Sequence, residues 1–139
     1  MDYYDRNSYY GRGSFIISGV TPATKYCKLI FSYNVLFYCC CEIQNDVFYA
    51  VLQYISPAEE AAKYQYKMEF DNKERTESLI FTRLARGFHE NLDEIHRSGK
   101  CVKLYADQFS HFMNEKGEVS FSMEIIANLD SCHYGHYYD

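Results

Sequence analysis

The sequence predicts an all-β domain, an antiparallel β-sandwich of about eight strands with one or two short helices. Apolar and polar residues alternate along two segments, Lys63–Asp71 and Glu118–Ile125. Such alternation puts every second side chain on one face, as in a strand with one buried side. The chain also contains 15 tyrosines and 10 phenylalanines among 139 residues. Aromatic residues favour strands, so all three observations indicate the same fold class.

The first half of the chain is expected to contain four strands. Ser14–Ser18 is short and apolar and would be the first of them. Lys28–Phe31 and Val35–Ile43 follow, with Ser32-Tyr33-Asn34 as a tight connection between them. Val47–Ile55 is apolar on nearly both faces, which predicts a central strand covered on both sides.

A hairpin and a final strand are expected in the second half. Lys63–Asp71 is followed by the turn residues Asp71-Asn72-Lys73, and Arg75–Leu84 would return beside it. The last strand, Glu118–Ile125, follows a turn predicted over Asn114–Gly117.

Three segments are typical of helix rather than strand. Ser56–Glu59 combines a capping residue, a proline and a glutamate at the spacing of a helix start, so we expect one turn there. Phe88–His96 spaces its apolar residues as a short amphipathic helix does. Asp107–Met113 is a second short helix, capped by Asp107, with Phe109, Phe112 and Met113 turned inward.

One domain is expected over residues 14–127, between a partly flexible N-terminal arm (1–13) and a flexible Tyr/His-rich tail (128–139). The net charge of −5 argues against non-specific nucleic-acid binding. The longest apolar run lies within Val47–Ile55, far short of the roughly 20 residues that span a membrane. The polar, acidic start resembles no secretory signal, so we expect an intracellular protein, cytoplasmic or nuclear.

The six cysteines indicate free, mostly buried thiols in an intracellular protein, with a disulfide framework as the alternative. Cys39, Cys40 and Cys41 are consecutive, and neighbours on a strand face opposite ways, so the three cannot converge on one ion. The tail carries Cys132-His133 and His136, one ligand short of a closed zinc site. We therefore expect no metal and no cofactor, and interpret the tail as a flexible segment.

The sequence shows no catalytic constellation. Cys101 could be paired with His89 or His96 as a thiol and imidazole, but their spacing does not favour this over a buried structural cysteine. No nucleophile elbow and no phosphate-binding glycine loop is present. We therefore expect that the chain is not an enzyme and that it acts by binding.

Tyr26 and Lys28 suggest where binding would occur. They are two residues apart in an otherwise apolar stretch, so on a strand their side chains point the same way. If that strand lies at a sheet edge, its backbone could pair with an extended peptide, with Tyr26 as a pocket wall and Lys28 as a charge. An ordinary solvent-facing pair is the alternative.

An ordered series of motifs resembles the C-terminal substrate-binding domain of the seven in absentia (SIAH-type) ubiquitin ligases, over about residues 7–126. It consists of Phe48–Ile55, Ala58–Ala61, Tyr64–Phe70, Phe88-His89-Glu90, Cys101 before an apolar strand, and Phe112–Gly117. The resemblance implies a TRAF-like sandwich of eight strands that dimerises and captures degron peptides of target or adaptor proteins by strand addition. In that family ubiquitin transfer belongs to a separate RING, which this sequence lacks.

The resemblance also implies a peptide groove. With Gly11 and Phe15 as anchors, the family's groove positions fall near four residues of this chain, Asn7, Tyr9, Tyr26 and Lys28. The family has an apolar side chain where this sequence has Lys28, which implies altered specificity, with a preference for an acidic or polar ligand residue. The alternative function is a stand-alone structural, adaptor or decoy module that dimerises, with itself or with a related domain, and lacks ligase activity.

Overall fold

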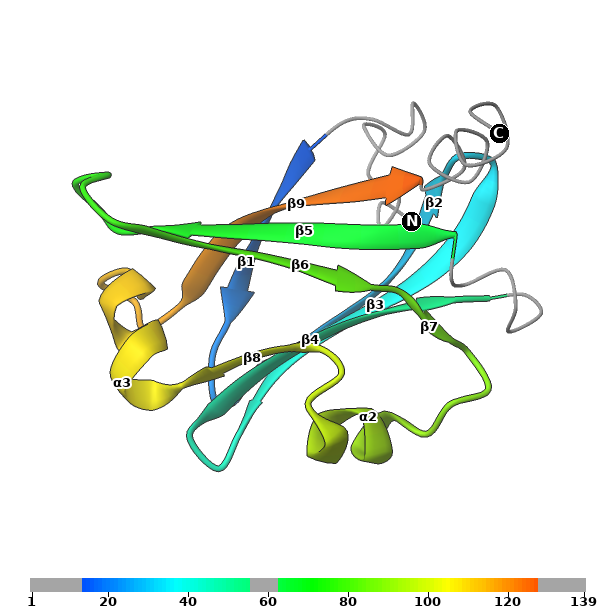
Figure 1. Cartoon of the computed structure of the whole chain (residues 1–139). Coiled ribbons are helices and arrows are strands. Elements are labelled where there is room, and N and C mark those ends of the chain that lie inside the picture. Colours follow the sequence, from blue (N-terminus) through cyan, green and yellow to red (C-terminus); the bar gives the residue numbers. More distant parts are fainter. Residues whose placement is uncertain (1–13, 56–62, 128–139) are drawn as a thin grey trace, which may run out of the picture.

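The computed structural model describes residues 14–55 and 63–127, which form two facing β-sheets (Figure 1). The predicted all-β sandwich is thereby confirmed. The first sheet has four strands, all antiparallel to their neighbours. In spatial order they are β1 (Ser14–Val20), β9 (Val119–Ala127), β5 (Tyr64–Asp71) and β6 (Ser78–Leu84).

The second sheet is built around β4, the strand predicted to be central. Its order begins β2 (Tyr26–Ser32), β3 (Val35–Gln44), β4 (Val47–Tyr54). Along its far side β4 pairs first with β8 (Val102–Tyr105) and then with β7 (Arg86–Gly87). The two-residue β4–β7 pairing is parallel, which the prediction of a purely antiparallel sandwich missed. It is too short to carry a hydrophobic pattern of its own.

Tight turns set the register of the β2–β3 and β3–β4 hairpins. Tyr33 and Asn34 have φ of 56° and 61°, and Asn45 and Asp46 have φ of 52° and 65°. Positive φ at both central residues defines the type I′ turn, whose twist suits antiparallel strands. The tight connection predicted at Ser32–Asn34 is therefore confirmed.

Helix α2 (Leu92–Ser98) begins later than the predicted segment Phe88–His96. Asn91 caps it, because the Asn91 side chain accepts a hydrogen bond from the backbone N–H of Glu94 at 3.1 Å. Gly99 ends it with a φ of 74°. Phe88 precedes the helix and is 50% exposed, so its apparent helical spacing was misleading. Figure 1 shows α2 on the side of the second sheet that faces away from the first.

The helix predicted over Asp107–Met113 consists of α3 (Ala106–Phe109) and a 3₁₀ turn, η2 (Ser110–Phe112). The cap position is Tyr105 rather than Asp107, and the Tyr105 N–H donates to the Gln108 side chain at 3.3 Å. Phe109 and Phe112 are buried, as predicted, while Met113 is half-buried. The turn predicted over Ser56–Glu59 lies outside the described residues.

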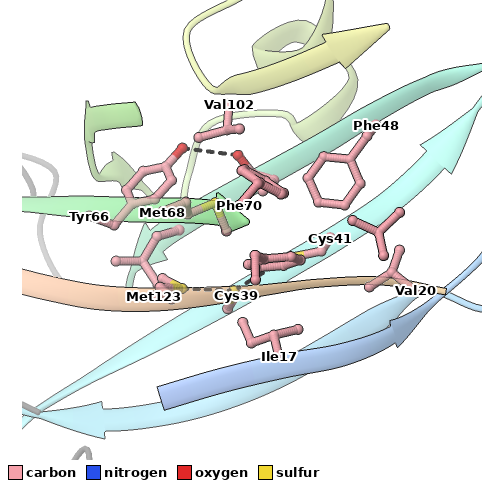
Figure 2. Close-up of a cluster of buried hydrophobic side chains, with 14 of the residues drawn as sticks. Ile17, Val20, Cys39, Cys41, Phe48, Tyr66, Met68, Phe70, Val102 and Met123 are labelled. Carbon is pink, nitrogen blue, oxygen red and sulfur yellow. Dashed lines mark hydrogen bonds between the residues drawn. The ribbon is translucent and has the colours of Figure 1, made fainter. Parts of the chain in front are cut away.

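The core lies between the two sheets, and sulfur contributes to it (Figure 2). Cys39 and Cys41 point inward, whereas Cys40 does not belong to this cluster, as strand alternation predicted. The Cys39 thiol contacts the sulfur of Met123 in the opposite sheet at 3.8 Å. Strand β6 begins at Ser78 rather than Arg75, because the side chain of Asn72 accepts hydrogen bonds from the backbone of the intervening turn.

Candidate functional site

Strand β2, which carries two of the four predicted peptide-binding residues, stands at one end of its sheet. Within residues 14–55 and 63–127, the only strand that pairs with β2 is β3. A strand at the end of a sheet is where an added strand can extend the hydrogen-bond ladder. Among the strands that the structure describes, β2 therefore lies at the end of its sheet, which is the condition that the sequence hypothesis set.

The register turns Tyr26 and Lys28 toward the core side of the sheet. Tyr26 is opposite Cys41 and Lys28 is opposite Cys39, and both cysteines are buried between the sheets. Directly opposed residues share a face, so Tyr26 and Lys28 lie on the side of β2 that faces the sandwich interior. Tyr26 packs against the core. An ordinary solvent-facing residue would not make this contact.

Tyr26 and Lys28 also interact with each other. The Lys28 ammonium lies 5.9 Å from the centre of the Tyr26 ring, within cation–π range. Both side chains are half-buried. An aromatic ring and a positive charge therefore lie next to each other on β2, each partly accessible. Asn7 and Tyr9, the other predicted groove residues, lie outside the described residues.

The opposite face of β2 carries a feature that sequence reasoning missed. Cys27 is directly opposite Cys40, and their sulfur atoms are 3.1 Å apart. Burial, and then the hydrogen bond with Cys27, raises the pKa of the Cys40 thiol well above its usual range. Hydrogen bonding to Cys27 likewise raises the pKa of Tyr38. The sequence contains both cysteines, but only the strand register shows that they meet.

Helix α2 covers the outer face of β4 through a second apolar cluster. Its members are Val51, Ile95 and Cys101, with Tyr49 and Leu92 packed against them. His96 stacks on Tyr49 with ring centres 4.1 Å apart and planes at 15°. Among the described residues, neither ring nitrogen of His96 has a hydrogen-bond partner. Burial lowers the pKa of His96, and Lys103 lowers it further, against opposing contributions from Glu42 and Asp93.

The candidate thiol–imidazole pair is not assembled. The Cys101 thiol donates instead to the backbone carbonyl of Ile95 at 3.8 Å. Burial raises the pKa of Cys101, which disfavours the nucleophilic thiolate. His96 lies against Tyr49, and His89 is exposed. No hydrogen bond joins Cys101 to either of these described histidines.

Two open hollows flank Phe112 at the end of the sandwich formed by α3, η2 and the β5–β6 turn. One has a volume of about 360 Å³ and is lined by Asp71, Lys73, Phe112, Met113, Asn114, Glu115 and Ser120. The other is about 440 Å³ and is lined by Glu77, Ser78, Leu79, Asp107, Gln108, His111 and Phe112. Lys73 and Glu115 pair at 2.8 Å on the first of them, and both are largely exposed. Tyr26 and Lys28 contribute to neither hollow.

The described part of the chain contains no group of three or more His, Cys, Asp or Glu side chains that could hold a metal ion. None of the helices in that part is both long and apolar enough to cross a bilayer. The tail residues Cys132, His133 and His136 lie outside the described residues.

Two facing sheets with few helices place the chain among all-β sandwich domains. A family model described as the Sina, TRAF-like domain matches residues 30–124, more than two thirds of the chain, so the chain belongs to this family. The resemblance noted from the sequence is thereby confirmed. The match begins at Ile30, so Tyr26 and Lys28 precede it. No curated protein matches the chain.

Proposed function

We propose that this chain is a protein-interaction domain that binds an extended, degron-like peptide of a target or adaptor protein along β2. The observation that carries the proposal is the placement of Tyr26 and Lys28 on the strand at the end of the second sheet, half-buried beside the sandwich core. Membership of the Sina, TRAF-like family supports an interaction role. In this proposal the domain acts without catalysis, in ubiquitin-dependent degradation inside the cell.

The proposed binding divides affinity and selectivity between backbone and side chains. A peptide strand added beside β2 would gain main-chain hydrogen bonds, which depend little on its sequence. Alternate peptide side chains would point toward the sandwich interior, where Tyr26 offers an aromatic wall. The Lys28 ammonium would attract an acidic or polar side chain at that place, since a half-buried charge is screened less than an exposed one.

Affinity measurements on selected peptides test this proposal. Peptides would be selected from a random library on the purified chain, and dissociation constants measured for the tightest binder with wild type, Tyr26→Ala and Lys28→Glu. We expect each variant to bind roughly tenfold more weakly, the effect of losing about 1.4 kcal/mol at a central contact. Lys25→Glu is the matched control, because Lys25 is exposed and precedes β2. Equal affinity in all four proteins would refute this groove.

Dimerisation, with itself or with a related domain, is part of the same proposal. Phe88 is half exposed and packs edge-on against Tyr38 on the outer face of β3, at a ring distance of 6.1 Å. An exposed aromatic side chain packed on a half-buried one is the kind of surface that subunit interfaces use. Sedimentation of wild type and Phe88→Ser would test whether this face mediates self-association. A dimer that forms normally while no library peptide is enriched would favour the structural or decoy role instead.

A further inference from the structure

Cys27 and Cys40 meet the distance requirements of a disulfide while remaining thiols in this structure. They are directly opposite on antiparallel strands, where Cα atoms lie about 4.5–5.5 Å apart. Disulfides need Cα atoms about 4.4–6.8 Å apart. The two sulfur atoms are 3.1 Å apart. Bond formation would therefore need only small adjustments of the side chains.

The two thiols also differ in solvent exposure, which determines which of them reacts first in a thiol–disulfide exchange. Cys27 is half-buried and so can be reached from solution, whereas Cys40 is 1% exposed. The Cys40 thiol donates to the carboxylate of Glu42 at 3.9 Å, and Gln44 holds that carboxylate by a hydrogen bond of 3.0 Å. The Glu42 charge also raises the pKa of the Cys40 thiol, so Cys40 stays protonated until its sulfur attacks.

Other thiols in the described residues lack this combination. Cys39 and Cys41 have sulfur atoms 3.8 Å apart but lie in the core, on one strand. Residues that are two apart on a strand have Cα atoms about 6.6 Å apart, which is near the upper limit for a disulfide. Cys101 is buried under α2, with its thiol on the Ile95 carbonyl. The geometry therefore singles out one pair.

We propose that Cys27 and Cys40 form a reversible redox pair, oxidised by a low-molecular-weight disulfide such as glutathione disulfide, and that oxidation ties β2 covalently to β3. This goes beyond the proposed peptide binding and does not depend on it. Cys27 lies between Tyr26 and Lys28 in the sequence, and its side chain is on the opposite face of the strand. The bond would restrain the strand without occupying the face that Tyr26 and Lys28 share.

The reaction has two balanced steps. The Cys27 thiolate attacks glutathione disulfide, forming a mixed disulfide on Cys27 and releasing one glutathione. The Cys40 sulfur then attacks the Cys27 sulfur, the mixed disulfide breaks, and the second glutathione leaves. The Cys40 proton leaves as its sulfur attacks and passes, by way of the Glu42 carboxylate, to the departing glutathione thiolate. In sum, two protein thiols and one glutathione disulfide give one protein disulfide and two glutathione molecules.

Mass spectrometry in glutathione redox buffers tests the pairing. The folded chain would carry Cys132→Ser, so that the tail thiol does not react, and would be acid-quenched before measurement. We expect loss of two hydrogen atoms, no bound glutathione, and a Cys27–Cys40 link in the peptide map, all reversed by excess reduced glutathione. In this background Cys40→Ser should retain one glutathione on Cys27, Cys27→Ser should retain none, and Cys101→Ser should behave like the parent.

Hydrogen exchange tests the restraint of β2. We expect its amides to exchange roughly tenfold more slowly in the oxidised parent than in the reduced parent, because local opening is restricted. In Cys40→Ser, where Cys27 retains a glutathione, the same oxidising buffer should not slow the exchange of the β2 amides. The proposal is overturned by a glutathione adduct that persists on Cys27 of the parent, by an absence of reaction, by a link between other cysteines, or by equal exchange rates.

Discussion

The hydroxyl of Tyr66 donates a hydrogen bond to the backbone carbonyl of Ala50 at 3.0 Å, and so joins β5 in one sheet to β4 in the other (Figure 2). Tyr66 is fully buried, and this burial raises its pKa. Sheets in a sandwich are held together mainly by non-directional apolar packing. This polar contact therefore helps to fix how the two sheets align.

Tyr66→Phe should lower the free energy of unfolding by about 1–2 kcal/mol, because it removes a buried hydrogen bond and leaves the Ala50 carbonyl with one partner fewer. Urea denaturation measures the change. Tyr105→Phe is the matched control, since Tyr105 is 52% exposed, and it should change stability by less than about 0.5 kcal/mol. Equal losses in the two variants would show that the Tyr66 contact contributes nothing specific.

Acid should destabilise the domain through His96. The lowered pKa of His96 means that the unfolded state binds more protons once the pH falls below about 6.5, the ordinary histidine value. Stability is then fully present above that pH and decreases as the pH falls toward the lowered value. The groups that affect His96 are Glu42, Asp93 and Lys103. Unfolding free energies between pH 7.5 and about 5 measure the effect.

His96→Phe is the variant that identifies the titrating group. Phenylalanine keeps a flat ring stacked on Tyr49, and it removes the two buried ring nitrogens that lack hydrogen-bond partners in wild type. At pH 7.5 the variant should be more stable than wild type by about 1 kcal/mol, the cost of leaving polar atoms unsatisfied. Its stability should also decrease less between pH 6.5 and 5. An equal decrease in wild type and His96→Phe would show that His96 is not the group responsible.

Glu90 should contribute more to the free energy of unfolding than a glutamate in an exposed ion pair does. Arg86 donates two hydrogen bonds to one Glu90 oxygen, at 3.2 and 2.9 Å, and the Gly87 N–H donates to the other at 3.1 Å. Partial burial raises the pKa of Glu90, but these hydrogen bonds outweigh it and leave the pKa lowered. Glu90→Gln should therefore cost about 1 kcal/mol of stability at neutral pH.

Glu94→Gln is the control for that comparison. Glu94 pairs with Arg97 at 2.8 Å, but both side chains are about two-thirds exposed, at 69% and 67%. Exposed pairs contribute roughly 0.2–1 kcal/mol, so the change should be small. Since the pKa of Glu90 is lowered, the stability that the Glu90 carboxylate contributes should be lost as the pH falls below about 4.3, the ordinary glutamate value. A larger loss in Glu94→Gln than in Glu90→Gln would contradict this ranking.

Lys28 should decide which charge the proposed groove prefers. For a selected peptide, variants with Glu or Lys at the position facing Lys28 would be compared by fluorescence anisotropy. Wild type should prefer the Glu peptide, and Lys28→Glu should reverse the preference. The difference should shrink as salt rises, because the charges are only partly buried. An unchanged preference in Lys28→Glu would show that Lys28 does not contact that peptide position.

Local sequence patterns were sufficient to predict most strands. Alternation along Lys63–Asp71 and Glu118–Ile125 required only that one face be buried, and both segments are strands with alternating burial. The apolar run Val47–Ile55 indicated a strand covered on both sides, and β4 has the core on one face and α2 on the other. The edge position of the strand carrying Tyr26 and Lys28 was stated only as a condition, since strand order is not a local property.

By itself the sequence determined the fold class, the main strands and the family, because side-chain alternation and turn chemistry act over a few residues. Only the tertiary structure decided which strands are neighbours. It turned Tyr26 and Lys28 to the core side of the sheet, and it brought Cys27 to 3.1 Å from Cys40. Cross-strand register depends on both strands at once, and no spacing along the chain encodes it.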